Sequence, residues 1–390
     1  MGLCYSRGLI SITKIVESMN PDYVLIYNAD GYLVSYTDQT LSTSAHGDDT
    51  CYWQSTDDGY QHVLTGQTLT GVETGVETGV ETGTETDLQD RDGNQVSGGP
   101  FRITAAPPRM ASEILATLND QGFAIIDRLM SDREIAQLKE QTAIARGRDH
   151  ADEAPNDGNF WITDSLIWSA DVARAVTHPV ALWVMQQYMS SDEIHFCHQP
   201  IVNTLKPADK LIGQFPEGGW HSDYPYHGNV FPNNDWPEQP VFGVQFNICI
   251  DEFRADNAAT QYVPDSYKLR KMPPQEVNTG GTRMGEGIHT DVKQWIAPAG
   301  SAVIYDSRMW HRACHELNVS GLDRIAILNA VSPAYVQPMM NKSHLGRQYQ
   351  DSPVAAALTE RENIDIDRLC CRPMLPLPQG MPAMHGRTPG

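Results

Sequence analysis

The sequence predicts an α+β fold that is mainly β: a double-stranded β-helix core, of the jelly-roll or cupin-like type, with flanking helices on one sheet. Helical patterns come first, between residues 111 and 189, and strand patterns dominate from about 193 to 335. Helices followed by a run of strands are typical of a sandwich that carries helices on one sheet. Residues 101–345 also have the length of a single domain of this class.

Four helices are expected before the strands, over residues 111–120, 131–146, 169–177 and 179–189. Ser131-Asp-Arg-Glu134 has the order of a capping box, in which the serine and glutamate side chains satisfy backbone donors of the first turn. Pro179 suits the first turn of the last helix, because its missing N–H has no intrahelical partner there. The sequence therefore marks where two of these helices begin.

Two predicted strands lie close to polar residues. Residues 301–305 have the composition of a short strand, and a bend then leads to Met309-Trp-His311. Residues 323–332 form an apolar run rich in β-branched residues, which favours a buried strand, yet the run contains Arg324. A buried guanidinium is costly unless an anion meets it, and its planar fork matches a carboxylate. The distal carboxylate of 2-oxoglutarate is one such partner, and an acidic side chain of the protein is the alternative.

His221-Ser-Asp223 is a candidate pair of metal ligands. Successive side chains of a strand point to opposite faces, so His221 and Asp223 share one face while Ser222 points away. Two imidazoles and one carboxylate can occupy one face of a metal ion and leave the other face open, which is the ligand set of non-haem Fe(II) oxygenases. A lone pair of this kind is more often a surface turn, but the later His311 completes the set.

Several blocks of residues occur in a fixed order along the chain: Leu118-Asn-Asp-Gln-Gly-Phe-Ala-Ile-Ile126, His198-Gln-Pro-Ile-Val-Asn203, Gly219-Trp-His-Ser-Asp223, Asn257-Ala-Ala-Thr-Gln-Tyr-Val-Pro-Asp-Ser-Tyr-Lys268 and Pro298-Ala-Gly-Ser-Ala-Val-Ile-Tyr305. In this order and spacing, residues 101–345 resemble the phytanoyl-CoA dioxygenase family of Fe(II)/2-oxoglutarate-dependent oxygenases. The second and third blocks are similar to those of the ectoine hydroxylases of this family. The stretch that follows Asp223 is not, so ectoine is not the expected substrate.

The resemblance implies an enzyme that hydroxylates an aliphatic C–H bond of a small-molecule substrate and releases succinate and CO2. Its cofactors would be Fe(II), the cosubstrate 2-oxoglutarate and O2. The implied site residues are the iron ligands His221, Asp223 and His311, the C5-carboxylate ligand Arg324, and the further cosubstrate contacts Gln199 and Asn203.

Four aromatic residues next to the predicted metal site are candidates for lining a substrate pocket: Trp220, Tyr224, Tyr226 and Trp236. The alternative is that they belong to the core, as aromatic residues beside strands more often do.

Three positions depart from the family pattern. Asn247 stands where tryptophan is frequent, Tyr267 replaces a histidine, and Ala326 replaces the hydroxyl residue that usually follows the arginine. These departures keep a non-catalytic jelly-roll scaffold protein as a rival hypothesis. Desaturation, cyclisation or epimerisation at the same centre also stay open, whereas a zinc hydrolase would leave Arg324 unexplained.

The composition favours a soluble enzyme. A net charge of −21 over 390 residues argues against nucleic-acid binding as the main role. No apolar run approaches the roughly 18 residues that a membrane span needs. The seven cysteines are scattered, and no secretory leader is evident, so a cytoplasmic location is expected. The sequence does not indicate an oligomeric state.

The ends of the chain differ in composition from the predicted domain. Residues 1–64 are an extension of uncertain structure, in which residues 21–37 alternate around a turn as a hairpin would. Residues 65–100 contain an acidic Thr/Gly/Glu repeat and are predicted to form a disordered linker. Residues 346–390 are rich in proline and methionine and are expected to be irregular.

Overall fold

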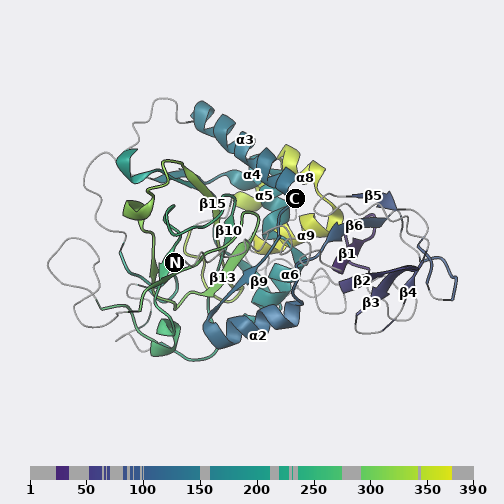
Figure 1. The fold of residues 1–390 in the computed structure, drawn as a ribbon, viewed down its shortest axis with the longest axis horizontal. Coiled ribbons are helices and arrows are strands. Elements are labelled where there is room, and N and C mark those ends of the chain that lie inside the picture. Colours follow the sequence, from purple (N-terminus) through teal and green to yellow (C-terminus); the bar gives the residue numbers. More distant parts are fainter. Residues whose placement is uncertain are drawn as a thin grey trace, which may run out of the picture. The chain divides into compact units, whose positions relative to one another are not determined.

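The computed structural model describes residues 23–34, 52–63, 66, 68–70, 82–85, 88–90, 92–96, 99, 101–149, 159–210, 219–227, 231, 236–274, 291–340 and 344–370. The chain divides into two compact units, one formed by Met1–Ser44 with Asp49–Met110 and the other by Ala45–Asp48 with Ala111–Gly390. Figure 1 shows the helices and strands of both units.

The first unit contains a six-stranded antiparallel sheet with the strand order β4-β3-β2-β1-β6-β5. Its strands are β1 (Tyr23–Tyr27), β2 (Tyr52–Thr56), β3 (Gly59–His62), β4 (Thr68–Leu69), β5 (Thr82–Glu85) and β6 (Phe101–Ala105). Trp53, Leu69 and Phe101 are fully buried in one apolar cluster of this unit. The sheet therefore has an apolar core of its own.

The structure corrects the predicted linker over residues 65–100. β4 and β5 lie inside this segment, and β5 pairs with β6. Leu69 and Leu88 fill the core cluster, so a few apolar residues hold parts of the segment in the sheet despite its repeat. The repeat residues 71–81 lie outside the described part of the chain.

Two further predictions concern this unit, namely that residues 101–105 belong to the second unit and that residues 21–37 form a hairpin. β6 pairs with β1, so residues 101–105 belong to the first unit and not to the start of the second. The predicted hairpin is found at its turn, where Gly31 N donates to Asn28 O at 3.0 Å and Tyr27 bridges Leu33. The main partners of β1 are nevertheless β2 and β6, which supply longer ladders.

The second unit contains a larger and a smaller antiparallel sheet. The larger sheet has the order β7-β13-β10-β15-β9-β8, and its strands are β7 (Phe123–Ile126), β13 (Ala302–Asp306), β10 (Val244–Cys249), β15 (Arg324–Pro333), β9 (Ile194–Leu205) and β8 (Asn159–Ile162). The smaller sheet has the order β12-β11-β14, with strands β12 (Lys293–Gln294), β11 (Gln261–Tyr262) and β14 (His311–Arg312).

The two sheets of the second unit face each other across an apolar core. One buried cluster joins Cys249 and Tyr305 of the larger sheet with Tyr262 of the smaller sheet. Trp295, next to β12, stacks on Tyr262 with 4.8 Å between ring centroids. Both faces of β10 and β13 are buried, because the smaller sheet covers one face and helices pack on strands of the same sheet.

The helices of the second unit are α2 (Ala111–Gln121), α3 (Asp132–Asp149), α4 (Ser165–Trp168), α5 (Ala170–Val176) and α6 (Pro179–Met189). The four predicted helices are confirmed to within a few residues at each end. The predicted capping box forms as well, with Ser131 N donating to Glu134 Oε2 at 2.7 Å. Among these helices, α2, α4 and α6 contact strands of the larger sheet, and α2 lies beside α6 (Figure 1).

Gly122 carries the chain from α2 into β7. Its φ of +73° lies in the left-handed region, which favours glycine. A Cβ at this position would also lie 2.5 Å from the ring of Tyr267, which donates from its hydroxyl to Asp120 O. Tyr267 therefore packs against the end of α2.

The carboxyl-terminal segment is wrongly predicted as irregular over much of its length. The structure has three helices there, α7 (Leu345–Gln350), α8 (Pro353–Ala357) and α9 (Glu360–Leu369). A capping box starts α9, because Thr359 N donates to Glu362 Oε2 at 2.9 Å and Glu362 N donates to Thr359 Oγ1 at 3.3 Å. α9 contacts β9, so it is part of the second unit. Residues 371–390 lie outside the described part of the chain.

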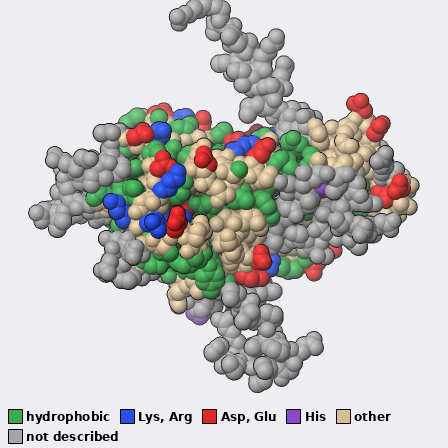
Figure 2. All heavy atoms as spheres, turned by 90° about the horizontal axis from the view of Figure 1, so that it is seen from below, with side chains coloured by type: hydrophobic (Ala, Val, Ile, Leu, Met, Phe, Trp, Pro, Cys, Tyr) green, Lys and Arg blue, Asp and Glu red, His purple; other side chains and the backbone are tan. Residues whose placement is uncertain are grey.

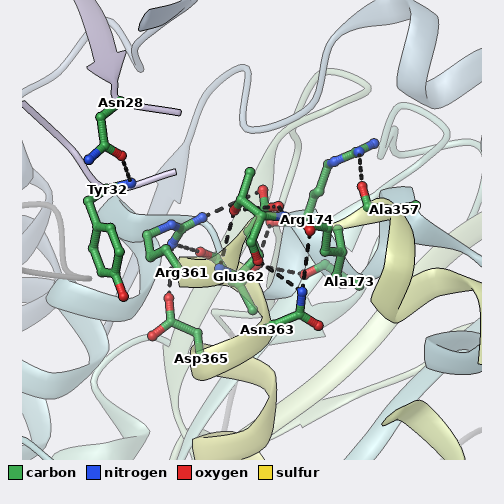
Figure 3. A network of polar contacts seen from close by, with 12 residues as sticks. Asn28, Tyr32, Ala173, Arg174, Ala357, Arg361, Glu362, Asn363 and Asp365 are labelled. Atoms are coloured by element: carbon green, nitrogen blue, oxygen red, sulfur yellow. Dashed lines mark hydrogen bonds and ion pairs between the residues drawn. The ribbon is translucent and has the colours of Figure 1, made fainter. Parts of the chain in front are cut away.

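Arg361 ties α9 to the rest of the second unit. Its side chain is 2% exposed, and its Nη1 donates to Asp365 Oδ2 and to Thr177 O, each at 2.9 Å (Figure 3). Thr177 follows α5, so this guanidinium joins α9 to α5. Removing one partner of such a buried pair is strongly destabilising, because the other polar group stays buried without a partner.

Arg361→Ala is expected to lower the free energy of unfolding by about 3–5 kcal/mol, because it breaks a buried pair and leaves the Asp365 side chain and the Thr177 carbonyl buried without their donor. Chemical denaturation of the full chain measures this change. The matched control is Arg254→Ala, which breaks an exposed pair with Asp256 and should cost no more than about 1 kcal/mol. Equal effects of the two substitutions would contradict a structural role for the buried pair.

Lys268 and Arg270 form ion pairs with acidic side chains. Lys268 Nζ lies 2.7 Å from Asp265 Oδ1, and Arg270 Nη1 lies 3.8 Å from Glu238 Oε2. On the face that Figure 2 shows, Lys and Arg side chains lie among Asp and Glu side chains.

Candidate metal centre

His221 and His311 come together through the backbone. They form an isolated antiparallel bridge in which His221 N donates to His311 O at 3.1 Å and His311 N donates to His221 O at 3.0 Å. Asp223 N donates to Ser307 O at 2.8 Å, which extends the same pairing. Ser222 points the other way and donates from its hydroxyl to Arg308 O. The alternation predicted for these residues is confirmed.

The three candidate ligands converge. Ligand atoms of His221, Asp223 and His311 all lie within 4.8 Å of one another. His311 Nε2 lies 3.1 Å from Asp223 Oδ2, and His221 Nε2 lies 3.6 Å from Asp223 Oδ1. The donors therefore surround one point, at spacings that fit a single ion.

Backbone carbonyls orient both imidazoles. His221 Nδ1 lies 2.6 Å from Gly219 O, and His311 Nδ1 lies 2.9 Å from Met309 O. A proton on each Nδ1 leaves each Nε2 with a free lone pair that points toward Asp223. Hydrogen bonds of this kind fix the tautomer of metal-binding histidines.

The charges at the site favour an ionised carboxylate. Burial alone would raise the pKa of Asp223, but the imidazoles of His311 and His221 lower it to about 2. Burial opposes protonation of His311, yet the adjacent Asp223 raises the pKa of this histidine above its usual value. Burial and the neighbouring His311 lower the pKa of His221.

The residues present fit a divalent metal ion. Asp223 Oδ2 is buried and has no hydrogen-bond partner among the residues that the structure describes, although His311 Nε2 is near. A buried carboxylate oxygen without a donor is costly, and a cation between it and the two imidazoles removes that cost. Two imidazoles and one carboxylate on one side of the ion match a non-haem iron site.

Arg324 lies deep in the same unit, at the start of β15. Its side chain is 3% exposed, and burial lowers the pKa of its guanidinium to about 10. Nη1 donates to Ala258 O at 2.8 Å, and the guanidinium lies over the ring of Phe253 at 4.3 Å from the centroid. Among the described residues no carboxylate forms an ion pair with Arg324, and its Nε has no partner. The guanidinium is therefore available for an anionic ligand.

Asn203 lies on β9 directly opposite Ala326. Opposite residues of an antiparallel pair share a face, and Cys249 of β10 pairs with Ala326 from the other side. Asn203 is 6% exposed, and its Oδ1 has no partner in the described part of the chain. Gln199 lies farther along β9, within the stretch where the register with β15 shifts.

The structure shows the contacts of the four aromatic candidates. Trp220 packs with Val263 and Trp310 in a separate buried cluster. Tyr226 is 1% exposed and lies 5.3 Å from Trp236 between ring centroids.

The hydroxyl of Tyr226 accepts a hydrogen bond from Phe242 N, which holds the ring in the core. Tyr224 is partly exposed and donates to Gln337 O at 2.6 Å. Trp220, Tyr226 and Trp236 therefore make contacts of the kind that core residues make, and their place in a substrate pocket stays a prediction.

Tyr305 is a residue of the site that the sequence does not single out. Its hydroxyl lies 3.3 Å from His311 Nε2 and 3.3 Å from Asn247 Nδ2. Burial, and then the nearby Asp223 carboxylate, raise the pKa of Tyr305 well above its usual value, so the hydroxyl keeps its proton. Alternation along β13 places this side chain between the sheets, but an aromatic residue in a strand is usually core.

Residues 118–325 match the model of the family described as Phytanoyl-CoA dioxygenase (PhyH), which covers more than half of the chain. The chain belongs to this family. The PhyH chain is 22% identical over 284 residues to "Dioxygenase cdmD" of Talaromyces verruculosus, covering 66% of this chain and 84% of that protein. It is 27% identical over 137 residues to "Dioxygenase hkm4" of Aspergillus hancockii, covering 35% and 40% respectively.

The PhyH chain is also similar to solved structures. The epimerase SnoN from nogalamycin biosynthesis is 14% identical with a TM-score of 0.43, over 57% of this chain and 81% of that one. EvdO2 from Micromonospora carbonacea var. aurantiaca is 17% identical with a TM-score of 0.45, over 59% and 94%. As a member of the PhyH family, the protein is a 2-oxoglutarate-dependent dioxygenase that uses Fe(II). Its described helices include none with the length and hydropathy of a membrane span.

Iron binding by this PhyH protein is expected to weaken as the pH falls. Histidine binds a metal only as the neutral imidazole, so the metal must displace any proton on His311. Because the pKa of His311 lies above the usual 6.5, affinity is full above that raised pKa and falls below it, by roughly tenfold per pH unit for one proton. Anaerobic Fe(II) titrations over this range measure the slope, and a pH-independent affinity would contradict it.

Proposed function

We propose that this dioxygenase hydroxylates an aliphatic C–H bond of a small-molecule substrate. One observation carries the proposal: three converging metal donors and the buried guanidinium of Arg324, which has no acidic partner among the described residues, belong to one unit. A scaffold protein has no need of a buried cation without an anion, and such a group is costly to retain. The two facing sheets of this unit support a jelly-roll arrangement around the site.

In this proposal His221, Asp223 and His311 hold the iron. When bound, the iron and 2-oxoglutarate supply the chemistry that converts cosubstrate and O2 to succinate and CO2 while a substrate C–H bond is oxidised. The chain contributes the orientation of its donors, through the carbonyls that fix both imidazoles. It also contributes an ionised carboxylate, because Asp223 keeps its charge down to a pH of about 2.

Arg324 is proposed to bind the distal carboxylate of 2-oxoglutarate. Its planar guanidinium can donate two parallel hydrogen bonds to a carboxylate. Ala326 lies two residues after Arg324 on β15, and Cys249 of β10 is its partner in the sheet. Both side chains are small, which leaves room beside the guanidinium. Asn203, opposite Ala326, supplies a polar group where the alanine has none.

The substrate is proposed to approach from the side of His221. The side chain of His221 is 45% exposed, whereas that of His311 is 6% exposed. The apolar cluster around Trp295 and Tyr262 closes the opposite side and excludes water from the distal imidazole. The open side is therefore where a substrate C–H bond can reach the metal.

The test is succinate formation from 2-oxoglutarate with stoichiometric O2 consumption, measured against a panel of small molecules. The proposal predicts that one class of compound stimulates succinate release and gains one oxygen atom, seen by mass spectrometry. His221→Ala is the inactive control, since it removes a ligand from the exposed side. A product that lacks two hydrogens, or that is an isomer of the substrate, would replace hydroxylation with another outcome at the same centre.

A further inference from the structure

Tyr305 and Asn247 form a polar pair beside the metal ligands. Both side chains are buried, with exposures of 2% and 8%. Asn247 lies on β10 and Tyr305 on the adjacent strand β13. Most of their neighbours between the sheets are apolar. Buried polar groups need hydrogen-bond partners, so these two side chains must satisfy each other or a neighbouring polar group.

The orientation of the Asn247 amide is set by the backbone. Asn329 N donates to Asn247 Oδ1 at 3.4 Å, which assigns the oxygen end of the amide. The nitrogen end then donates to the Tyr305 hydroxyl at 3.3 Å. Because the tyrosine oxygen accepts from Asn247, its own proton must point elsewhere.

The proton of Tyr305 faces the metal ligands. The hydroxyl lies 3.3 Å from His311 Nε2, which in turn lies 3.1 Å from Asp223 Oδ2, a buried oxygen without a hydrogen-bond partner among the described residues. With a metal bound, His311 Nε2 would hold the metal and would not accept this proton. The carboxylate of Asp223 is then the acceptor that remains.

We infer that Tyr305 is a positioning residue, held by Asn247, that donates to Asp223 and fixes the carboxylate for metal binding. This inference rests on the proposed function, because it assigns Asp223 as a ligand. Partners that orient a ligating carboxylate typically change metal affinity by about 10–100-fold when they are removed. The phenylalanine or other apolar residue that a core strand would carry here could not donate.

Mn(II), which prefers the same nitrogen and oxygen donors, tests the inference without turnover. Free Mn(II) is counted by electron paramagnetic resonance in titrations of the full chain. Tyr305→Phe is expected to weaken Mn(II) binding about tenfold, since it removes only the hydroxyl. Asn247→Leu is expected to weaken binding by a smaller factor, about threefold, because the hydroxyl stays but is no longer oriented.

The matched control is Tyr262→Phe. Its ring belongs to the same cluster and stacks on Trp295, and although its backbone pairs with that of His311, no described contact of its side chain is with a candidate ligand. This variant should bind Mn(II) within about twofold of wild type. The double variant Tyr305→Phe with Asn247→Leu should be no weaker than Tyr305→Phe alone, because the two residues act in series.

The outcomes separate the inference from the proposed function. Wild-type affinity in Tyr305→Phe, with His221→Ala unable to bind, would overturn the role of Tyr305 and leave the metal site intact. Equal Mn(II) binding by wild type and His221→Ala would overturn both. If Tyr305→Phe does not fold, unchanged affinity in Asn247→Leu overturns the inference, and the expected weakening supports it. A purely structural pair would lower the thermal midpoint without this change in affinity.

Discussion

Asp223→Asn is expected to abolish iron-dependent turnover. The substitution keeps the size of the side chain but removes the only carboxylate among the three converging donors. A single charge pair at about 4 Å contributes about 4 kcal/mol under partly buried conditions, so Fe(II) affinity should fall by roughly a thousandfold or more. Anaerobic Fe(II) titration and 2-oxoglutarate-dependent succinate release measure the two effects.

The metal-free variant should be less stable than metal-free wild type at neutral pH, as thermal unfolding without metal measures. The imidazoles of His311 and His221 lower the pKa of Asp223 to about 2, so the folded protein favours the charged carboxylate that asparagine lacks. The matched control is Asp256→Asn, which changes an exposed carboxylate paired with Arg254 and should leave iron binding unchanged. Full iron affinity in Asp223→Asn would remove this carboxylate from the metal centre.

Arg324→Met is expected to weaken 2-oxoglutarate binding by about a hundredfold or more. The substitution keeps an unbranched side chain but removes two charge-assisted hydrogen bonds, each of which contributes about 1.5–3 kcal/mol. Arg324→Lys should fall between wild type and methionine, because it keeps the charge without the planar fork. Isothermal titration of 2-oxoglutarate into the Fe(II) protein without O2 gives both affinities.

The same substitution should stabilise the protein in the absence of cosubstrate, by about 1–3 kcal/mol, because it removes a buried cation that lacks an anion. The sign follows from the pKa. Burial lowers the pKa of Arg324 to about 10, so the folded protein disfavours the charged form that is present at neutral pH. A strong loss of apo stability with unchanged cosubstrate affinity would instead make Arg324 a structural residue.

Part of the geometry of the candidate metal centre is local and can be predicted from the sequence. His221 and Asp223 share a face through strand alternation alone, and a short bend places His311 on the strand that bridges back to them. Arg324 stands out because a cation in an apolar run needs an explanation, and the structure keeps it buried without an acid among the described residues. Strand alternation and a cation in an apolar run are both visible in the sequence of one strand.

Features that depend on distant partners were not predictable in the same way. Residues 65–100 look disordered by composition, yet β5 pairs with β6 and Leu88 joins a core built from other strands. Among the helices after residue 345, α9 contacts the segment after α5 through the hydrogen bond from Arg361 to Thr177, far away in the chain. Local composition does not contain such pairings.

The roles of aromatic residues were ambiguous, because nearness to the ligands in sequence does not say whether a ring faces the site or the core. Trp220 and Tyr226 lie next to the metal ligands in sequence, but their rings pack in buried clusters. Tyr305 lies six residues before His311 and has the composition of a core strand, yet its hydroxyl reaches the ligand atoms. The hydroxyl of Tyr305 is held by Asn247 of the adjacent strand β10, a contact that the sequence of β13 alone does not contain.

The most direct test of the account is iron anomalous diffraction from crystals of the full chain, prepared anaerobically with Fe(II) and 2-oxoglutarate. The expected result is one anomalous peak bonded to His221, Asp223 and His311, with the distal carboxylate of 2-oxoglutarate on the guanidinium of Arg324. Iron bound elsewhere, or an acidic side chain of the protein against Arg324 with the cosubstrate absent, would contradict the assignment.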